Sequence, residues 1–105
     1  MTVYVDNFRC PATVGGLRGR WSHLTANTPA ELHAFALLIG LQPVWFQGRC
    51  KSGPCPTAGG VCVHFHYDVT DGKRKRAIER GAIPIKLLAF GAIISARRPI
   101  YQEQA

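Results

Sequence analysis

Hydrophobic and polar residues alternate over residues 62–69, and this period of two predicts a β-strand. Successive side chains on a strand point to opposite faces, so one face is apolar and consists of Val63, Phe65, Tyr67 and Val69. The other face carries four side chains that bind metal ions or transfer protons, namely Cys62, His64, His66 and Asp68. A short basic helix is predicted directly afterwards, over residues 70–80. We expect the junction between this strand and this helix to be the functional centre.

A helical period predicts a second helix over residues 28–40. Its apolar face is formed by Leu32, Phe35, Ala36 and Ile39. Thr28 is suited to cap the first turn, Pro29 to occupy the first helical position, and Glu31 to complete a capping box. Gly40 is suited to end the helix, because it adopts left-handed backbone without strain.

Three further strands are predicted. Residues 3–5 form a short apolar run that ends at Asp6, and residues 43–47 form a second. Residues 83–87 form the last, and Pro84, which has no amide hydrogen to donate, indicates a sheet edge or the start of a strand.

The connecting segments complete a single domain over residues 1–105. Residues 7–27 predict a long loop, and the Cys-, Gly- and Pro-rich residues 48–61 predict an inserted loop. Residues 88–96 fit a strand or a helix, and residues 97–105 read as a polar C-terminal tail. The resulting order favours an α/β or α+β fold, a small sandwich of two helices on a short mixed, partly parallel sheet.

Composition adds a broad class and a preference for anions. The chain has 105 residues, of which 47% are hydrophobic and 18% charged, as in a folded globular domain. Its net charge of +7 favours polyanions. No secretory signal opens the chain, and its longest apolar run is shorter than the about 20 residues that span a membrane. We therefore expect a cytoplasmic protein that does not bind a membrane. Its four cysteines are then expected to be thiols or metal ligands.

The inserted loop and the strand after it offer a candidate zinc site. Its members are Cys50, Cys55, Cys62 and His64, and three thiols with one imidazole can close a tetrahedral zinc site. The spacing differs from that of a standard zinc knuckle or ribbon. The alternative is a surface loop with incidental thiols.

A second candidate set consists of Asp6, His23, His66 and Asp68. Ligands of α/β sheets bind beyond the carboxyl ends of strands, where Asp6 and Asp68 are predicted to lie. If those two strands are neighbours, the cluster suits catalytic proton transfer or binding of a divalent ion. The alternative is that Asp68 caps a helix and His23 makes a loop hydrogen bond.

An anion site is predicted at the start of the basic helix. Amide groups after Thr70, with Lys73 and Arg74 beside them, can hold a phosphate. The rest of the predicted ligand-binding set consists of Arg9, Arg20 and Ser22, with Trp21 or Tyr67 to stack on the ligand. The alternative is a solvated basic helix.

Several motifs together suggest a family. They are Val3-Tyr4-Val5-Asp6, Trp21-Ser22-His23-Leu24-Thr25-Ala26, Glu31-Leu32-His33-Ala34-Phe35-Ala36, Gly40-Leu41, Trp45-Phe46-Gln47, His66-Tyr67-Asp68-Val69-Thr70 with Lys73-Arg74, and Gly81-Ala82. Through them, residues 2–86 resemble DUF4031, a family of small bacterial and phage proteins of unknown function. The resemblance implies no activity, and for a phage protein it implies the host cytoplasm. The family pattern has a shorter link where this chain has the cysteine-bearing loop.

The preferred hypothesis is recognition of a nucleotide or another phosphorylated ligand, with acid–base hydrolysis if the protein is an enzyme. The alternative is a non-catalytic accessory module, stapled by zinc, that binds nucleic acid or protein. The apolar residues 87–94 fit either the core or the interface of a homodimer.

Overall fold

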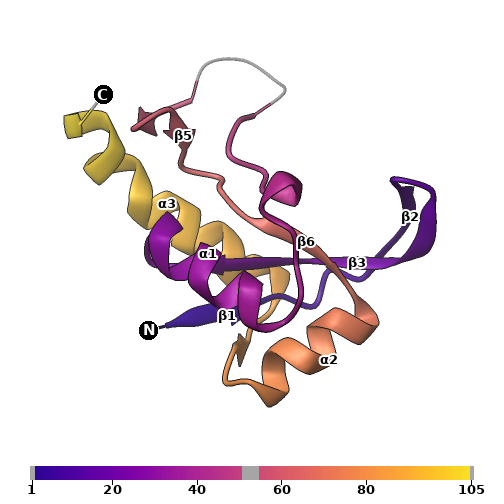
Figure 1. The fold of residues 1–105 in the computed structure, drawn as a ribbon. Helices are drawn as coiled ribbons and strands as arrows, with labels where there is room; N and C mark the ends of the chain where they lie inside the picture. Colours follow the sequence, from indigo (N-terminus) through magenta and orange to yellow (C-terminus); the bar gives the residue numbers. More distant parts are fainter. Residues whose placement is uncertain (1, 51–54, 105) are drawn as a thin grey trace.

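The computed structural model describes residues 2–50 and 55–104, and the fold of these residues is α+β (Figure 1). The main sheet contains β1 (Val3–Val5), β2 (Cys10–Val14), β3 (Leu17–Ala26), β6 (Tyr67–Thr70) and β7 (Ile83–Pro84). A small second sheet pairs β4 (Thr57–Ala58) with β5 (Val61–Cys62). The helices are α1 (Pro29–Leu38), α2 (Asp71–Glu79), α3 (Leu87–Gln104) and the 3-10 helix η1 (Pro43–Trp45).

Strand β3 organises the main sheet, because β1, β2 and β6 all pair with it in antiparallel fashion. Leu24 of β3 lies opposite Val5 of β1 and opposite Tyr67 of β6, so β1 and β6 flank β3 on its two edges. Strand β7 adds to β1 in parallel and makes the sheet mixed. The predicted mixed, partly parallel sheet is therefore confirmed.

The two faces of the sheet are covered by different helices. On one face, Leu24 and Ala26 of β3 join a core with Leu32 and Phe35 of α1 and Ala77 of α2. On the other face, the alternate β3 residues contact α3. His23 stacks on Phe90, and Thr25 accepts a hydrogen bond from Arg97. The sheet thus separates the main core from a face that carries polar groups.

The predicted helix over residues 28–40 is confirmed. Thr28 accepts a hydrogen bond from the Glu31 amide at 3.2 Å, Pro29 opens α1, and Gly40 has a left-handed φ of 81°. All four residues of its predicted apolar face are buried. The prediction for α2 is confirmed in the same way, since Thr70 caps it and accepts from the Lys73 amide.

The prediction of a strand over residues 43–47 is wrong. Residues 43–45 form η1, which starts at Pro43, and only Gln47 makes an isolated bridge, to His66. Val44 is 81% exposed and Trp45 48% exposed, so their apolar side chains do not mark a buried strand.

The prediction of a loop over residues 7–27 is also wrong, because these residues contain the β2–β3 hairpin. Its two-residue turn is Gly15-Gly16, with φ values of 56° and 81°. Positive φ at both turn residues matches the twist of antiparallel strands and favours glycine at both positions.

Two other strands are shorter than predicted. Of residues 62–69 only 67–69 belong to β6, and residues 63 and 64 form a turn after β5. The predicted apolar side is nevertheless buried throughout, at 0–1% exposure for Val63, Phe65, Tyr67 and Val69. The strand predicted over residues 83–87 contains only 83–84, and it lies at the sheet edge as expected for Pro84.

Helix α3 resolves residues 88–96 as helical and corrects the predicted polar tail, since the helix continues through residue 104. Arg97 is only 6% exposed and belongs to the interior. The described residues therefore contain three α-helices instead of two. Among these residues, no helix has the length and apolar character that crossing a membrane requires.

The Thr28 cap offers a test of this fold. Thr28→Ala is expected to lower the free energy of unfolding by about 1 kcal/mol, because it removes the acceptor of the Glu31 amide. Urea unfolding followed by circular dichroism measures the change. Thr28→Ser keeps the hydroxyl and is expected to retain most of the stability. Equal losses in the two variants would contradict the capping role.

Candidate functional site

Asp6, His23 and Asp68 form a row across three strands. Asp6 follows β1, and its amide donates to the His23 carbonyl of β3 at 3.0 Å. His23 lies directly opposite Asp68 of β6. The strands that carry Asp6 and Asp68 are therefore not neighbours, which was the condition stated for this cluster. They flank β3, which supplies His23 between them. We call Asp6, His23, His66 and Asp68 the His–Asp centre.

Asp6 holds the ring of His23. Its side chain is fully buried and accepts hydrogen bonds from the amides of Phe8 and His23, at 3.1 and 2.9 Å, and from His23 Nδ1. Burial alone would raise the pKa of Asp6, but these hydrogen bonds outweigh it and hold the pKa below its usual value. An ionised Asp6 keeps the proton of a neutral His23 on Nδ1 and leaves a lone pair on Nε2.

Two aromatic rings fix the plane of the His23 imidazole. Phe8 and Phe90 stack on it with centroid distances of 5.3 and 4.8 Å and interplanar angles of 9° and 13°. Sequence analysis missed both residues. Phe8 fell in a segment predicted as a loop, and Phe90 in the segment that remained unassigned.

His66 approaches from the segment that leads into β6. Its Nδ1 lies 2.7 Å from the His64 carbonyl, and its Nε2 lies 3.1 Å from Asp68 Oδ1. Burial would raise the pKa of Asp68, but the hydrogen bond with His66 and the nearby histidine charges lower it. One donor atom each of His23, His66 and Asp68 lie within 4.8 Å of one another, and all three side chains are partly exposed. The centre is therefore open to solvent.

The predicted cysteine site also assembles. Cys50 Sγ lies 3.5 Å from Cys62 Sγ and 3.0 Å from His64 Nδ1, and one donor atom from each of these residues and Cys55 lies within 4.8 Å of the others. We call these four residues the Cys–His cluster. They sit close together and could hold a metal ion. Burial, with the neighbouring thiols, raises the pKa of Cys50 to about 12, and burial also lowers the pKa of His64.

The predicted anion site at α2 is occupied by contacts within the protein. Thr70 caps α2, and the Lys73 ammonium donates to the Ile39 carbonyl at the end of α1. Arg74 Nε donates to the Asp6 carbonyl at 2.8 Å. These three residues therefore also join elements of the fold.

The other five predicted ligand-binding residues differ in exposure. Tyr67 and Ser22 are buried at 1% exposure, so Tyr67 is badly placed to stack on a ligand. Trp21 donates to the Ala12 carbonyl within the hairpin. Arg9 and Arg20 are exposed, and Arg9 forms an ion pair with Asp71 at 2.8 Å.

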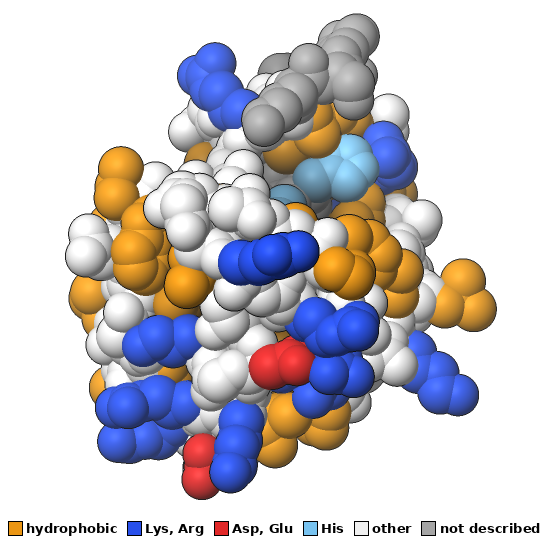
Figure 2. Space-filling model, turned by 90° about the vertical axis from the view of Figure 1, so that its right-hand side faces the viewer, with side chains coloured by type: hydrophobic (Ala, Val, Ile, Leu, Met, Phe, Trp, Pro, Cys, Tyr) orange, Lys and Arg blue, Asp and Glu red, His pale blue; other side chains and the backbone are white. Residues whose placement is uncertain are grey.

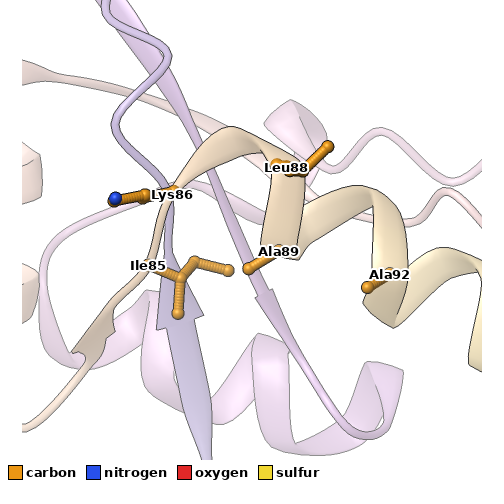
Figure 3. A pocket seen from close by; sticks show the side chains of 5 residues that line it. All are labelled: Ile85, Lys86, Leu88, Ala89 and Ala92. Carbon is orange, nitrogen blue, oxygen red and sulfur yellow. The ribbon is translucent and has the colours of Figure 1, made fainter.

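Histidine shares one face of the molecule with many basic side chains. Figure 2 shows histidine at the surface of this face, next to hydrophobic side chains, with lysine and arginine side chains spread over the same face. A separate apolar hollow of about 450 Å³ lies beside the start of α3 (Figure 3). Its lining residues are Ile85, Lys86, Leu88, Ala89 and Ala92, and none of them belongs to the predicted site.

Comparison with known proteins places the chain in a family. Residues 3–97 match the family model described as "Protein of unknown function (DUF4031)". The chain belongs to the DUF4031 family. The match reaches Arg97 and so includes most of α3, beyond the residues that carried the resemblance in the sequence. No curated protein and no solved structure matches this DUF4031 chain.

Proposed function

We propose that this DUF4031 protein binds a phosphorylated ligand at the His–Asp centre and hydrolyses its phosphate ester or anhydride bond. The observation that carries the proposal is the shared orientation of two imidazoles. Both have Nδ1 beside an acceptor, the carboxylate of Asp6 or the carbonyl of His64. Nε2 of His66 lies 3.1 Å from Asp68 Oδ1, and one ring nitrogen of His23 lies within 4.8 Å of the donor atoms of His66 and Asp68. Such a centre is suited to activating a water molecule, which attacks phosphorus while the bond to the leaving oxygen breaks.

The charge of the molecule supports an anionic ligand. The chain carries a net charge of +7, and lysine and arginine side chains are spread over the face at which histidine reaches the surface (Figure 2). A positive surface raises the local concentration of phosphorylated compounds. Phe8 is 45% exposed and stacks on His23, so it is available to contact an apolar or aromatic part of the ligand.

We further propose that the Cys–His cluster binds zinc. In a tetrahedral site with Zn–S bonds of about 2.3 Å, two sulfur atoms lie about 3.8 Å apart, close to the 3.5 Å between Cys50 Sγ and Cys62 Sγ. A site closed by four protein ligands is typical of structural zinc. Zinc here would tie the inserted loop to the segment that carries His64 and His66.

Phosphate release from p-nitrophenyl phosphate and a panel of mononucleotides tests the hydrolysis. His23→Ala is expected to lower kcat/KM by at least about 100-fold on any substrate that the parent protein hydrolyses. His33→Ala is the matched control, since His33 contacts Tyr67 in the core and lies outside both clusters. A parent protein inactive on the whole panel, or a His23→Ala variant with full activity, would overturn the proposal.

A second candidate is a non-catalytic nucleic-acid-binding module, and the β2–β3 hairpin favours it. This hairpin projects from the body of the molecule (Figure 1), and its Arg18 and Arg20 are exposed. Phosphate contacts would make the affinity fall steeply with salt. Arg20→Ala would then weaken binding of nucleic acid, whereas His23→Ala would leave it unchanged.

A further inference from the structure

We propose that the His–Asp centre holds a divalent metal ion through His23 Nε2, His66 Nε2 and an oxygen of Asp68. Positions left open on the ion would take the attacking water and the ligand. The identity of that ligand rests on the proposed function, whereas the metal site stands on the geometry of the three side chains.

The hydrogen bonding of His66 leaves room for a cation. A carbonyl oxygen only accepts, so His66 Nδ1 must donate its hydrogen to the His64 carbonyl at 2.7 Å. Nε2 of the neutral ring then carries a lone pair, yet it lies 3.1 Å from the Asp68 carboxylate, which also only accepts. Two acceptors at this distance repel each other unless a positive charge lies between them. A second ring proton or a metal ion supplies that charge.

His23 makes the metal ion the better solution. Asp6 accepts a hydrogen bond from His23 Nδ1, so Nε2 of a neutral His23 carries a lone pair. One ring nitrogen of His23 lies within 4.8 Å of a ring nitrogen of His66 and an oxygen of Asp68. One proton satisfies only one pair of acceptors, whereas a metal ion bonds all three donors at once. Two neutral imidazoles and one carboxylate are a ligand set found in catalytic metal sites.

The distances and the surrounding groups fit such an ion. Tetrahedral bonds of about 2.0–2.1 Å place two ligand atoms about 3.3 Å apart, near the 3.1 Å between His66 Nε2 and Asp68 Oδ1. Each histidine donates its other ring hydrogen to a carboxylate or a carbonyl, as metal-binding histidines in proteins do. Phe8 and Phe90 hold the His23 ring between them. The ligands are thus oriented before any ion binds.

The two clusters differ in a way that separates them experimentally. The Cys–His cluster offers sulfur ligands, whereas the His–Asp centre offers only nitrogen and oxygen. Co²⁺ bound at the Cys–His cluster has a thiolate-to-metal charge-transfer absorption band, whereas Co²⁺ bound at the His–Asp centre has none. His64 belongs to the first cluster through Nδ1 and orients His66 of the second through its carbonyl, so variants must leave His64 intact.

Titration with Co²⁺, followed by absorption and native mass spectrometry, tests the site. The parent protein is expected to bind two ions, one with and one without the thiolate band. His66→Ala and Asp68→Ala should each bind one ion and keep the band. Cys62→Ser should lose the band and keep the second ion, and His33→Ala should bind two. The proposal would be overturned if the parent protein bound Co²⁺ only at the site that has the thiolate band. It would also be overturned if His66→Ala still bound two ions.

Asp6→Asn provides a variant that removes no ligand. It is expected to weaken binding of the second ion by about 10- to 100-fold and to leave the thiolate band unchanged. Circular dichroism verifies that each variant is folded. Unchanged affinity in Asp6→Asn would contradict the role of Asp6 in orienting His23. These measurements need no substrate, so an inactive parent protein that binds the second ion would overturn the hydrolysis and support the metal site.

Discussion

Arg97→Met is expected to lower the free energy of unfolding by about 3–5 kcal/mol. The Arg97 guanidinium donates to the carbonyls of Val63 and Ala26 and to Thr25 Oγ1, at 2.9, 2.6 and 2.8 Å. It also lies 3.8 Å from the centroid of the Phe65 ring. Methionine fills much of the same volume but leaves these buried acceptors without a donor. Since domains of this size are stable by only about 5–15 kcal/mol, the variant should be close to unfolding.

Urea unfolding measures this loss of stability, provided that the slope of the unfolding free energy against urea concentration is the same in both proteins. Arg98→Met is the matched control. Arg98 is the next residue of α3, and it is exposed. We expect the control to change the stability by less than about 0.5 kcal/mol, as exposed substitutions usually do. Burial lowers the pKa of Arg97 to about 10, so the guanidinium remains charged at neutral pH. Similar stability in both variants would contradict the structural role of Arg97.

Loss of zinc from the Cys–His cluster is the second large effect that we expect. Zinc present at 1,000 times its dissociation constant stabilises a folded protein by about 4 kcal/mol, when it binds only the folded state. For a domain of this size, each 1 kcal/mol moves the melting temperature by about 4 °C. Cys62→Ser should therefore melt about 15 °C below the zinc-loaded parent and contain less zinc by one equivalent.

Cys10→Ser is the control for this measurement, because Cys10 is the one cysteine of the chain outside the cluster. Its thiol donates a weak hydrogen bond to the Pro11 carbonyl in the β2–β3 hairpin, and its side chain is half-buried. Elemental analysis and thermal unfolding of both variants, with and without added zinc, separate metal binding from loss of packing. A Cys62→Ser protein that retains the parent's zinc content would contradict the assignment.

Local signals predicted α1 and α2 well, whereas they did not assign residues 88–96 of α3 and predicted a polar tail for its last turns. Thr28, Pro29 and Gly40 each act through the backbone of their own neighbours, so they mark the ends of α1 without knowledge of the rest of the fold. The β2–β3 hairpin had a comparable signal in Gly15-Gly16 between residues of opposite strands, and this signal was overlooked. The strand predicted over residues 43–47 was wrong because its apolar residues do not share a buried face, and Val44 and Trp45 remain exposed.

The candidate site was predicted only in part. Alternation placed His64, His66 and Asp68 on the polar side of one segment, and the structure agrees that this side is partly exposed. The approach of His23 depends on the register between β3 and β6, which opposes His23 and Asp68 although 44 residues lie between them in the chain. Long-range pairing of this kind leaves no local pattern, and the same is true of the contact between Phe90 and His23.

The chain distances within the two clusters also imply an order of assembly. Cys50 lies 12 residues from Cys62 and 14 from His64, so closing that loop has a small entropic cost and needs little of the remaining fold. The row of Asp6, His23 and Asp68 exists only when β1, β3 and β6 have all paired. Pairing of such distant segments is the slow part of folding. During synthesis and refolding, the thiol-rich loop can therefore close early, whereas the His–Asp centre is completed only with the native sheet.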